Sequence, residues 1–428
     1  MRLVNDPIHG HILFDEFIWK IIDSPHFQRL GEIRQMDTTS FVFRGATHTR
    51  LAHSLGVAHL AKEMAKSIQE RQPELGITDA DIRAVQLAGL CHDLGHGPFS
   101  HLFDHGFMSI AKPELGWTHE SASAMMFEDL INSQNIDLDK VQVKFVQDLI
   151  KGDSSGYEKK FLFDIVANHR NSCDVDKFDY INRDCHFLGL FNKFDSSRLI
   201  HWSRVIDNEI CYPVKEAFNL FELFHTRFTL FKKAYTHKTS HAIELMIVDI
   251  LLAADKVLQI SNSVENASDF MKMTDQILSL IEYASNPELT EAQSILRRIR
   301  ERSLYRLLGE YYIPEFLSLD TNLVISHFDK ILLEYDLNVS DLKIAFVKCN
   351  HGFGNRNPLD HIKFYSKSDL SHSFTLKPEQ VSGCMPQKYQ ETRLRIYLKD
   401  LSKGDIAIRA LQEFEHQSLP KSVINLYA

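Results

Sequence analysis

The 428-residue chain lacks the patterns that mark several large protein classes. No apolar run approaches the roughly 20 residues that cross a bilayer, and neither end carries a lipidation signal, so we expect a soluble protein with no membrane partner. Its six cysteines include no CxxC pair and follow no secretory leader, which favours reduced thiols and an intracellular location, cytoplasmic or nuclear. The absence of GxGxxG and GKS loops argues against the Rossmann and P-loop classes.

Positive charge is also scarce. Lys plus Arg number 48 against 57 for Asp plus Glu, which gives a formal net charge of −9. The chain therefore lacks the overall basic footprint of a nucleic-acid binder, although a local basic channel for weak single-stranded nucleic acid stays open. With 44% apolar and 25% charged residues, it is neither disordered, collagen-like nor a coiled coil. Its length predicts one large lobe and one small one.

Apolar side chains recur mainly at helical spacing between residues 15 and 310. We predict a helix over 51–70 and a second helix whose start is marked by a capping box of Thr78 and Asp81. The segment 91–100 (CHDLGHGPFS) then forces a turn through its two glycines and its proline. The core should therefore be helical.

Alternation of apolar and polar residues replaces this spacing after residue 336. We predict a helix from about Asp405 and short strands at 343–349, 361–366, 373–377 and 393–398. The predicted fold is mainly α, with a helical core at residues 1–335 and a small α+β lobe at 336–428.

Histidine is abundant, with 22 residues in all and 11 before residue 120. Histidine is the commonest metal ligand and carries protons near neutral pH. Adjacent helical side chains point about 100° apart, so His92 and Asp93 reach one ion only at a helix end or bend, which the glycine turn supplies. With His53 on the preceding helix and Asp176 downstream, they make a two-His, two-Asp set suited to Mn, Fe, Zn or Mg.

Each piece also has a plainer interpretation. A lone buried histidine such as His53 is usually a hydrogen-bonded core residue. The pair at 92 and 93, followed by His96 and His101, resists that interpretation, because several titratable groups in one turn are costly to bury unless a metal or a substrate uses them.

Several segments resemble the HD-domain phosphohydrolases, above all the eukaryotic dNTP triphosphohydrolases that also carry a sterile-alpha-motif domain. These segments are HSLGV at 53–57, LCHDLGHGPFSHLFD at 90–104, WTHE at 117–120 and DVDKFDYINRDCHFLG at 174–189. The resemblance runs from NDPIHGHI near the start to NPLDHIKFY in the C-terminal lobe. We expect no sterile-alpha-motif domain ahead of it.

The resemblance implies an HD-domain core and a hydrolase that splits a dNTP into deoxynucleoside and inorganic triphosphate, with water attacking the α-phosphorus. It implies a divalent metal held by His53, His92, Asp93 and Asp176. It places the catalytic residues His96, His101, Asp104 and His119 around the α-phosphate. A metal lowers the pKa of bound water, and a histidine can protonate the leaving alkoxide. The first candidate for that acid is His101, and the second is His119 oriented by Asp104.

The resemblance also implies a set of substrate-binding residues. It places Arg50 and Lys177 on the phosphates, Tyr180 and Asp184 at the 3′ hydroxyl, Tyr235 against the deoxyribose, and Gln35 and Arg227 nearby. Asp176, Tyr180 and Asp184 recur every four residues, which favours one helix face. Taken alone, Lys177 is also explained as a solvated surface lysine.

Two positions near the substrate site depart from the family pattern. Arg227, Phe231 and Tyr235 follow one another at i+4 steps, so we expect position 231 to face the site on a helix. The family has a histidine there, and phenylalanine can neither donate a proton nor bind an anion, so the rate or the hold on the phosphates should differ. Thr236 replaces a glutamine near the base, which leaves the base preference open.

A nucleotide-regulated homo-oligomer, dimer or tetramer, is a further implication, with GTP and a dNTP as activators. The matching allosteric residues are Arg2, Asn5, Asp23 and Gln28 for one pocket and Arg198, Asn219, His237 and Lys238 for the other. Gly31 and Thr375 stand where the family has basic residues, so a GTP site should be weaker. The plainer interpretation is a charged surface.

Two other functions stay open. One is a different HD phosphohydrolase that acts on nucleoside monophosphates or nucleic-acid phosphodiesters and would release other products. The other is a nucleotide-binding or nucleic-acid-binding module that has lost catalysis. A broken metal set would mark the second, and all four ligands are present.

Overall fold

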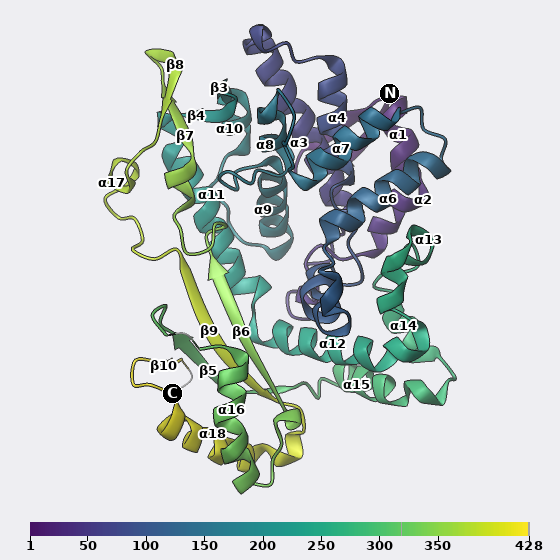
Figure 1. Cartoon of the computed structure of the whole chain (residues 1–428), viewed down its shortest axis with the longest axis vertical. Coiled ribbons are helices and arrows are strands. Elements are labelled where there is room, and N and C mark those ends of the chain that lie inside the picture. Colours follow the sequence, from purple (N-terminus) through teal and green to yellow (C-terminus); the bar gives the residue numbers. More distant parts are fainter. Residues whose placement is uncertain (318, 427–428) are drawn as a thin grey trace.

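The computed structural model describes residues 1–317 and 319–426. A large helical body makes up most of the molecule, and a smaller lobe built on long strands is attached to it (Figure 1). The prediction of a mainly α protein is confirmed. No helix within the described ranges has both the length and the apolar character needed to cross a membrane. All six cysteines are free thiols.

Three helices frame the centre of the body. They are α3 (Arg50–Arg71), α4 (Asp79–Cys91) and α9 (Val175–Leu188). The predicted capping box of Thr78 and Asp81 is present at the start of α4. Gly89 lets α4 approach α3 closely, because a Cβ atom there would lie 3.1 Å from the carbonyl oxygen of Val57. This packing places the end of α4 beside the middle of α3.

The remaining helices of the body surround this centre. They are α1 (Glu16–Ile22), α2 (Pro25–Gln28), α5 (Ser109–Ala111), α6 (His119–Ser133), α7 (Lys140–Lys151), α8 (Phe163–Val166), α10 (Ser196–Trp202), α11 (Ala217–Leu230), α12 (Lys238–Leu258), α13 (Ala267–Phe270), α14 (Ile277–Tyr283) and α15 (Thr290–Arg300). An antiparallel hairpin of β1 (Arg2–Asp6) and β2 (Gly10–Phe14) precedes them.

A four-stranded sheet lies on the edge of the body, in the order β3-β4-β7-β8. Its strands are β3 (Arg204–Ile206), β4 (Glu209–Pro213), β7 (Lys363–Ser366) and β8 (Asp369–Phe374). The first two were missed in a region read as helical. The strand predicted at 373–377 is also wrong, because β8 ends at Phe374. Its position is set by pairing with β7 across a short turn, Ser366 with Asp369, rather than by its own alternation.

The C-terminal lobe contains a second sheet in the order β10-β5-β9-β6, with all neighbours antiparallel. Its strands are β5 (Arg306–Ile313), β6 (Leu342–Asn350), β9 (Gln390–Leu398) and β10 (Ile424–Asn425). Helices α16 (Thr321–Glu334) and α18 (Gly404–Ser418) pack on it, and the short α17 (Pro378–Val381) lies outside it (Figure 1). The strands predicted at 343–349 and 393–398 and the helix from about Asp405 are therefore present.

The predicted boundary between residues 335 and 336 does not follow this packing. Tyr311 of β5 and Phe328 of α16 precede that boundary, yet both lie in the separate hydrophobic core of the C-terminal lobe. The apolar spacing of α16 does not reveal that this helix belongs to the second lobe, because apolar residues recur every 3.6 residues both in a helix packed on a sheet and in a helix packed on helices.

Candidate active site

Three segments bring the four predicted metal ligands together. His53 lies in α3, His92 and Asp93 follow the end of α4, and Asp176 lies in the first turn of α9. The His53 Nε2 atom is 3.0 Å from Asp176 Oδ1 and 3.6 Å from Asp93 Oδ2. The His92 Nε2 atom is 3.3 Å from Asp93 Oδ1 and 3.5 Å from Asp176 Oδ1. The four side chains therefore face one another over short distances.

The orientation of the two histidines fits a metal. His53 Nδ1 lies 2.7 Å from Asp179 Oδ2, and His92 Nδ1 lies 2.9 Å from the carbonyl oxygen of Gly89. Both contacts require an N–H on Nδ1, which leaves Nε2 as the atom that binds metal. Both Nε2 atoms are buried and have no hydrogen-bond partner among the described residues. His53, His92 and Asp93 form a group that could hold a metal ion, and the carboxylate of Asp176 adjoins both histidines.

The electrostatics of this cluster also favour a cation. Burial opposes a charge on Asp93, but Arg50, 2.8 Å away, and His92 hold the pKa of that carboxyl well below its usual range. Burial likewise opposes a charge on His53, but the carboxylates of Asp176 and Asp179 raise its pKa to about 10. The carboxylates are therefore ionised and attract positive charge.

The four predicted catalytic residues form a second group beside the first. His96 and His101 lie in and after the glycine turn, Asp104 in the π-helical segment Leu102–Met108, and His119 at the start of α6. The rings of His96 and His119 stack with centroids 4.0 Å apart, and the His101 ring lies 5.0 and 5.4 Å from them. Asp104 Oδ2 is 2.6 Å from His119 Nδ1.

Two histidines of this group differ in their readiness to hold a proton. Burial opposes a charge on His119, but the Asp104 carboxylate outweighs it and raises the pKa of His119. Burial and the positive charges of Arg50 and His119 lower the pKa of His96 well below its usual value. His96 is therefore neutral near pH 7, while His119 holds a proton more readily.

Arg50 joins the two groups. Its Nη1 donates to Asp93, its Nε donates to Ser100 Oγ at 2.8 Å, and its Nη2 donates to the backbone oxygen of Gln35 at 3.3 Å. The side-chain oxygen of Gln35 is buried without a hydrogen-bond partner among the described residues. Both predicted substrate residues thus lie next to the metal cluster.

Helix α9 carries three further predicted substrate residues. The Lys177 side chain is 13% exposed, and its Nζ lies 3.2 Å from Asp174 Oδ1. Burial opposes the charge on Lys177, but the Asp174 carboxylate outweighs it and raises the pKa of Lys177 to about 12. It is therefore no solvated surface lysine. A cavity of about 180 Å³ lies between Lys177 and the cluster, lined among others by His92, His119 and Asp176.

Two of the predicted sugar residues, Asp184 and Tyr235, meet beside the C-terminal half of α9. Asp184 accepts hydrogen bonds from the Tyr235 hydroxyl and from His48 Nε2, the latter at 2.6 Å. The Tyr180 ring lies 6.4 Å from the ring of His53. Asp176, Tyr180 and Asp184 all lie within α9, as their spacing predicted.

The prediction that Arg227, Phe231 and Tyr235 lie on one continuous α-helix is wrong. Helix α11 ends at Leu230, and Phe231–Tyr235 form a π-helical turn, because the Thr236 backbone N–H and hydroxyl both donate to the Phe231 carbonyl. The side chains still follow one another: the Arg227 guanidinium lies 4.3 Å above the Phe231 ring, whose centroid is 4.9 Å from that of Tyr235.

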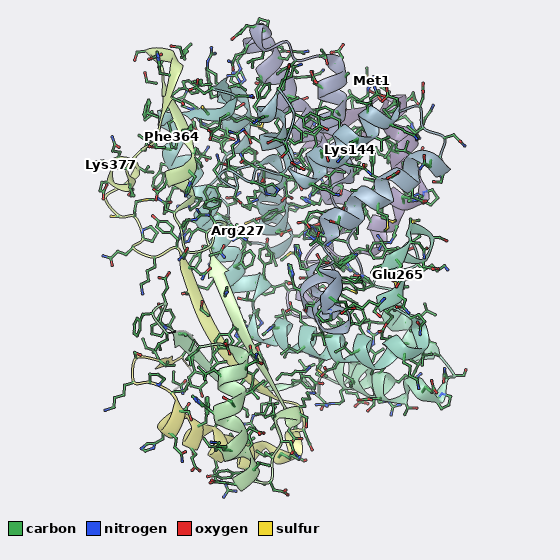
Figure 2. The ribbon with its side chains drawn as sticks, viewed as in Figure 1. Met1, Lys144, Arg227, Glu265, Phe364 and Lys377 are labelled. Carbon is green, nitrogen blue, oxygen red and sulfur yellow. The ribbon has the colours of Figure 1, made fainter. Side chains whose placement is uncertain are left out.

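Arg227 lies where α11 passes the upper ends of the long strands (Figure 2). Its Nη1 donates to the backbone oxygen of Asn350 at 2.7 Å and to Asn350 Oδ1 at 2.9 Å. Its Nε is buried without a hydrogen-bond partner among the described residues. Its positive charge opposes the rise that burial gives to the pKa of Tyr180. Arg227 therefore adds positive charge on the Tyr180 side of α9.

The first predicted activator group lies at the N-terminal hairpin. Arg2 pairs with Asp23 at 2.6 Å and lies over the Trp19 ring, Gln28 donates to the backbone of Ile22, and Asn5 pairs with His11 in the hairpin.

The residues of the second predicted activator group lie at two separate places in one chain. Arg198 and Asn219 both donate to Glu216, whereas His237 and Lys238 lie at the start of α12, beyond the whole of α11. Thr375 follows the end of β8, and Gly31 is exposed.

Two residues that hold the site were missed. Asp179 supports His53, and His48 supports Asp184. Asp179 lies three residues after Asp176 in a segment rich in acidic residues, so the sequence carried a signal for it. His48 carried none, because 136 residues separate it from its partner.

The chain is similar to several known proteins. A family profile described as "HD domain" matches residues 50–184. The chain is 40% identical to a protein named deoxynucleoside triphosphate triphosphohydrolase SAMHD1 from Bos taurus, over 98% of this chain and 78% of that relative. It is 39% identical to the protein of that name from Homo sapiens, over 95% and 72% of the two chains. A SAMHD1 homolog from Dictyostelium discoideum is 40% identical over 94% and 78%.

Proposed function

Because the chain belongs to the HD-domain family of deoxynucleoside triphosphate triphosphohydrolases, we propose that it hydrolyses a dNTP to deoxynucleoside and inorganic triphosphate. The observation that carries the proposal is the convergence of His53, His92, Asp93 and Asp176 beside the pair of Asp104 and His119. A cation site next to a protonated histidine is the combination that this hydrolysis requires.

His53, His92, Asp93 and Asp176 would hold the metal, the two histidines through their Nε2 atoms. Mn, Fe, Zn and Mg all accept this donor set. When bound, the ion polarises a phosphate oxygen and acidifies a water molecule. Arg50 adds a fixed positive charge at Asp93, on the side of Gln35.

The leaving group is the 5′ oxygen of the deoxyribose. A water oxygen forms a bond to the α-phosphorus, the bond from phosphorus to O5′ breaks, and O5′ takes a proton. His119 is the donor that the structure favours, because its Nδ1 is occupied by Asp104 and the residue lines the cavity beside Lys177, with its Nε2 3.5 Å from Glu120 Oε1. His101 is the alternative, since its ring lies 5.4 Å from that of His119. His96 stays neutral, and its ring nitrogens, which have no hydrogen-bond partner among the described residues, are available to the substrate.

The charged tail and the sugar would lie next to each other along α9, where Lys177, Tyr180 and Arg227 are close enough to affect one another's charge. Arg50, Lys177 and Arg227 supply three cations for the triphosphate. Asp184 and the Tyr235 hydroxyl, which already share a hydrogen bond, lie where the 3′ hydroxyl and the ribose ring would pack. A ring of this size against the sugar leaves little room for a 2′ hydroxyl, so we propose a preference for deoxynucleotides.

Regulation is a further part of the proposal. We propose a homo-oligomer, dimer or tetramer, in which GTP and a dNTP act as activators. Arg198 and Asn219 lie far from His237 and Lys238 in one chain, so a nucleotide that contacts all four must lie between chains. A weak interaction with single-stranded nucleic acid and an intracellular location remain part of the proposal.

The direct test is product analysis. Purified chain is incubated with each dNTP, with and without GTP, after removal of metal with EDTA and replacement by Mn²⁺, and products are resolved by ion exchange. We expect deoxynucleoside and inorganic triphosphate only when metal is present. Nucleoside monophosphates are incubated in parallel: release of orthophosphate from them would support the alternative HD phosphohydrolase, and binding without turnover of any substrate would support the module that has lost catalysis.

A further inference from the structure

The metal ligand His53 is connected to the N-terminal hairpin through a buried carboxylate. We propose that Asp179, held in place by His9 of the hairpin and by Arg183, is a positioning residue that fixes His53 for metal binding. The inference rests on the proposed function, because it concerns the same metal. It assigns a role in metal binding to β1–β2, an element that lies outside the matched HD domain and supplies no ligand itself.

Asp179 receives four hydrogen bonds from three side chains. Its Oδ2 lies 2.7 Å from His53 Nδ1 and 2.8 Å from Arg183 Nε, and its Oδ1 lies 2.6 Å from His9 Nε2 and 2.8 Å from Arg183 Nη2. The side chains of Asp179 and Arg183 are fully buried, and that of His9 is 9% exposed. Every acceptor position of this carboxylate is therefore in use, and its orientation is fixed.

The orientation decides which nitrogen of His53 binds metal. A carboxylate at Nδ1 requires the proton on Nδ1, so Nε2 has its lone pair free, and this atom faces Asp93 and Asp176. Such a carboxylate also makes the imidazole a stronger ligand. If Asp179 turned away, His53 could take the other tautomer or rotate, and one of the four ligands would be lost.

The hairpin is connected to the Asp179 carboxylate in two ways, directly through His9 and indirectly through Arg183. Besides the contact from His9, Asp6 Oδ2 accepts from Arg183 Nη1 at 2.9 Å. The other oxygen of Asp6 accepts from the backbone N–H groups of Ile8 and His9 at 2.8 and 2.9 Å and thereby shapes the turn. Asp6 therefore connects the two donors of Asp179: it shapes the turn that carries His9, and it accepts a hydrogen bond from Arg183.

A glycine in α3 makes room for this arrangement. A Cβ atom at Gly56 would collide with the Asp179 carboxylate and lie 2.6 Å from Arg183 Nη2. Gly56 lies one turn after His53 on the same helix, so α3 presents the ligand and the space for its support side by side. This explains a glycine in the middle of a 22-residue helix, where glycine is otherwise unfavourable.

The test measures Mn²⁺ affinity directly. Free Mn²⁺ is followed by electron paramagnetic resonance during titration of metal-free chain, for the unmodified protein, His9→Phe, His9→Gln and His11→Phe. His9→Phe keeps a ring of similar size but removes the hydrogen bond, and we expect about tenfold weaker Mn²⁺ binding, the lower end of the effect of such supporting partners. His9→Gln keeps an N–H donor and should recover most of the affinity. His11 is exposed in the same hairpin and should change nothing.

Two further readouts separate positioning from a loss of fold. The melting temperature of the metal-free protein should be nearly the same for His9→Phe and His11→Phe, and the lost dNTP hydrolysis of His9→Phe should return at saturating Mn²⁺. Unchanged Mn²⁺ affinity in His9→Phe, or a loss that His9→Gln shares fully, would overturn the inference while leaving the proposed function intact. If the unmodified chain binds no Mn²⁺ and carries no metal after purification, the proposed function itself fails, and the inference fails with it.

Discussion

His119 Nδ1 lies 2.6 Å from the carboxylate of Asp104, and this contact raises the pKa of the imidazole although the ring is largely buried. Protonated His119 is the active form if it donates to O5′, so turnover should be full below its pKa and fall as the pH rises through it. In Asp104→Asn the carboxylate no longer supports the charge, and the alkaline limb of the kcat profile should move to lower pH. Steady-state kinetics between pH 6 and 10 check this.

Substitutions at His119 and His101 distinguish between the two candidates for the general acid. His119→Gln should lower kcat by about 100-fold or more, the usual share of a general acid, with bound metal unchanged. If His101→Gln removes the alkaline limb while His119→Gln keeps it, the acid is His101 and the assignment of His119 is wrong.

Asp176 is the ligand that lies farthest from the others in sequence and is the most exposed of the four, at 28%. Asp176→Ala should abolish binding of metal and dNTP hydrolysis while leaving the melting temperature of the metal-free protein close to that of the unmodified chain. His186→Ala, an exposed change on the same helix, is the control. Retained turnover in Asp176→Ala would refute the metal assignment.

The Phe231 ring supports Arg227, whose guanidinium lies 4.3 Å from the ring centroid. Phe231→Leu removes this cation–π contact, worth about 0.5–1 kcal/mol, so KM for a dNTP should rise about two- to fivefold with kcat little changed. Phe231→Tyr keeps the ring face and should behave like the unmodified protein. Equal KM values for Phe231→Leu and Phe231→Tyr would show that Arg227 needs no such support.

Gly31 leaves space for a larger side chain, because the nearest atom to an added Cβ is Leu51 Cδ1 at 3.6 Å, an ordinary contact. If a GTP pocket forms at this face, Gly31→Arg should lower the GTP concentration for half activation by about tenfold, the effect of one charge-assisted hydrogen bond of roughly 1.5 kcal/mol. Gly31→Gln adds length without charge and serves as control. An activation curve that is the same in all three proteins would contradict the account of that pocket.

Local patterns predicted the elements that hold the metal. Helix α4 was predicted from its capping box and apolar spacing, and the bend at His92 and Asp93 from the glycines that follow. Short-range rules govern these features, so a short stretch of sequence contains the whole cause.

Long-range features were not predictable in this way. His9 is 170 residues from Asp179, and no spacing rule connects a hairpin turn to the middle of α9. Strands β3 and β4 were missed because they are short and largely buried, and a short buried strand has no alternation. In the π-helical turn at Phe231–Tyr235, the Thr236 backbone N–H and hydroxyl both donate to the Phe231 carbonyl, and the residue spacing alone does not reveal this change of helix pitch.

The central claim is hydrolysis at the α-phosphorus beside a metal held by His53, His92, Asp93 and Asp176. The most direct measurement is the fate of oxygen when a dNTP is hydrolysed in H₂¹⁸O with Mn²⁺ present, followed by mass spectrometry of both products. The account predicts one ¹⁸O atom in the inorganic triphosphate and none in the deoxynucleoside. Label in the deoxynucleoside, or the release of pyrophosphate and dNMP instead of triphosphate, would contradict it.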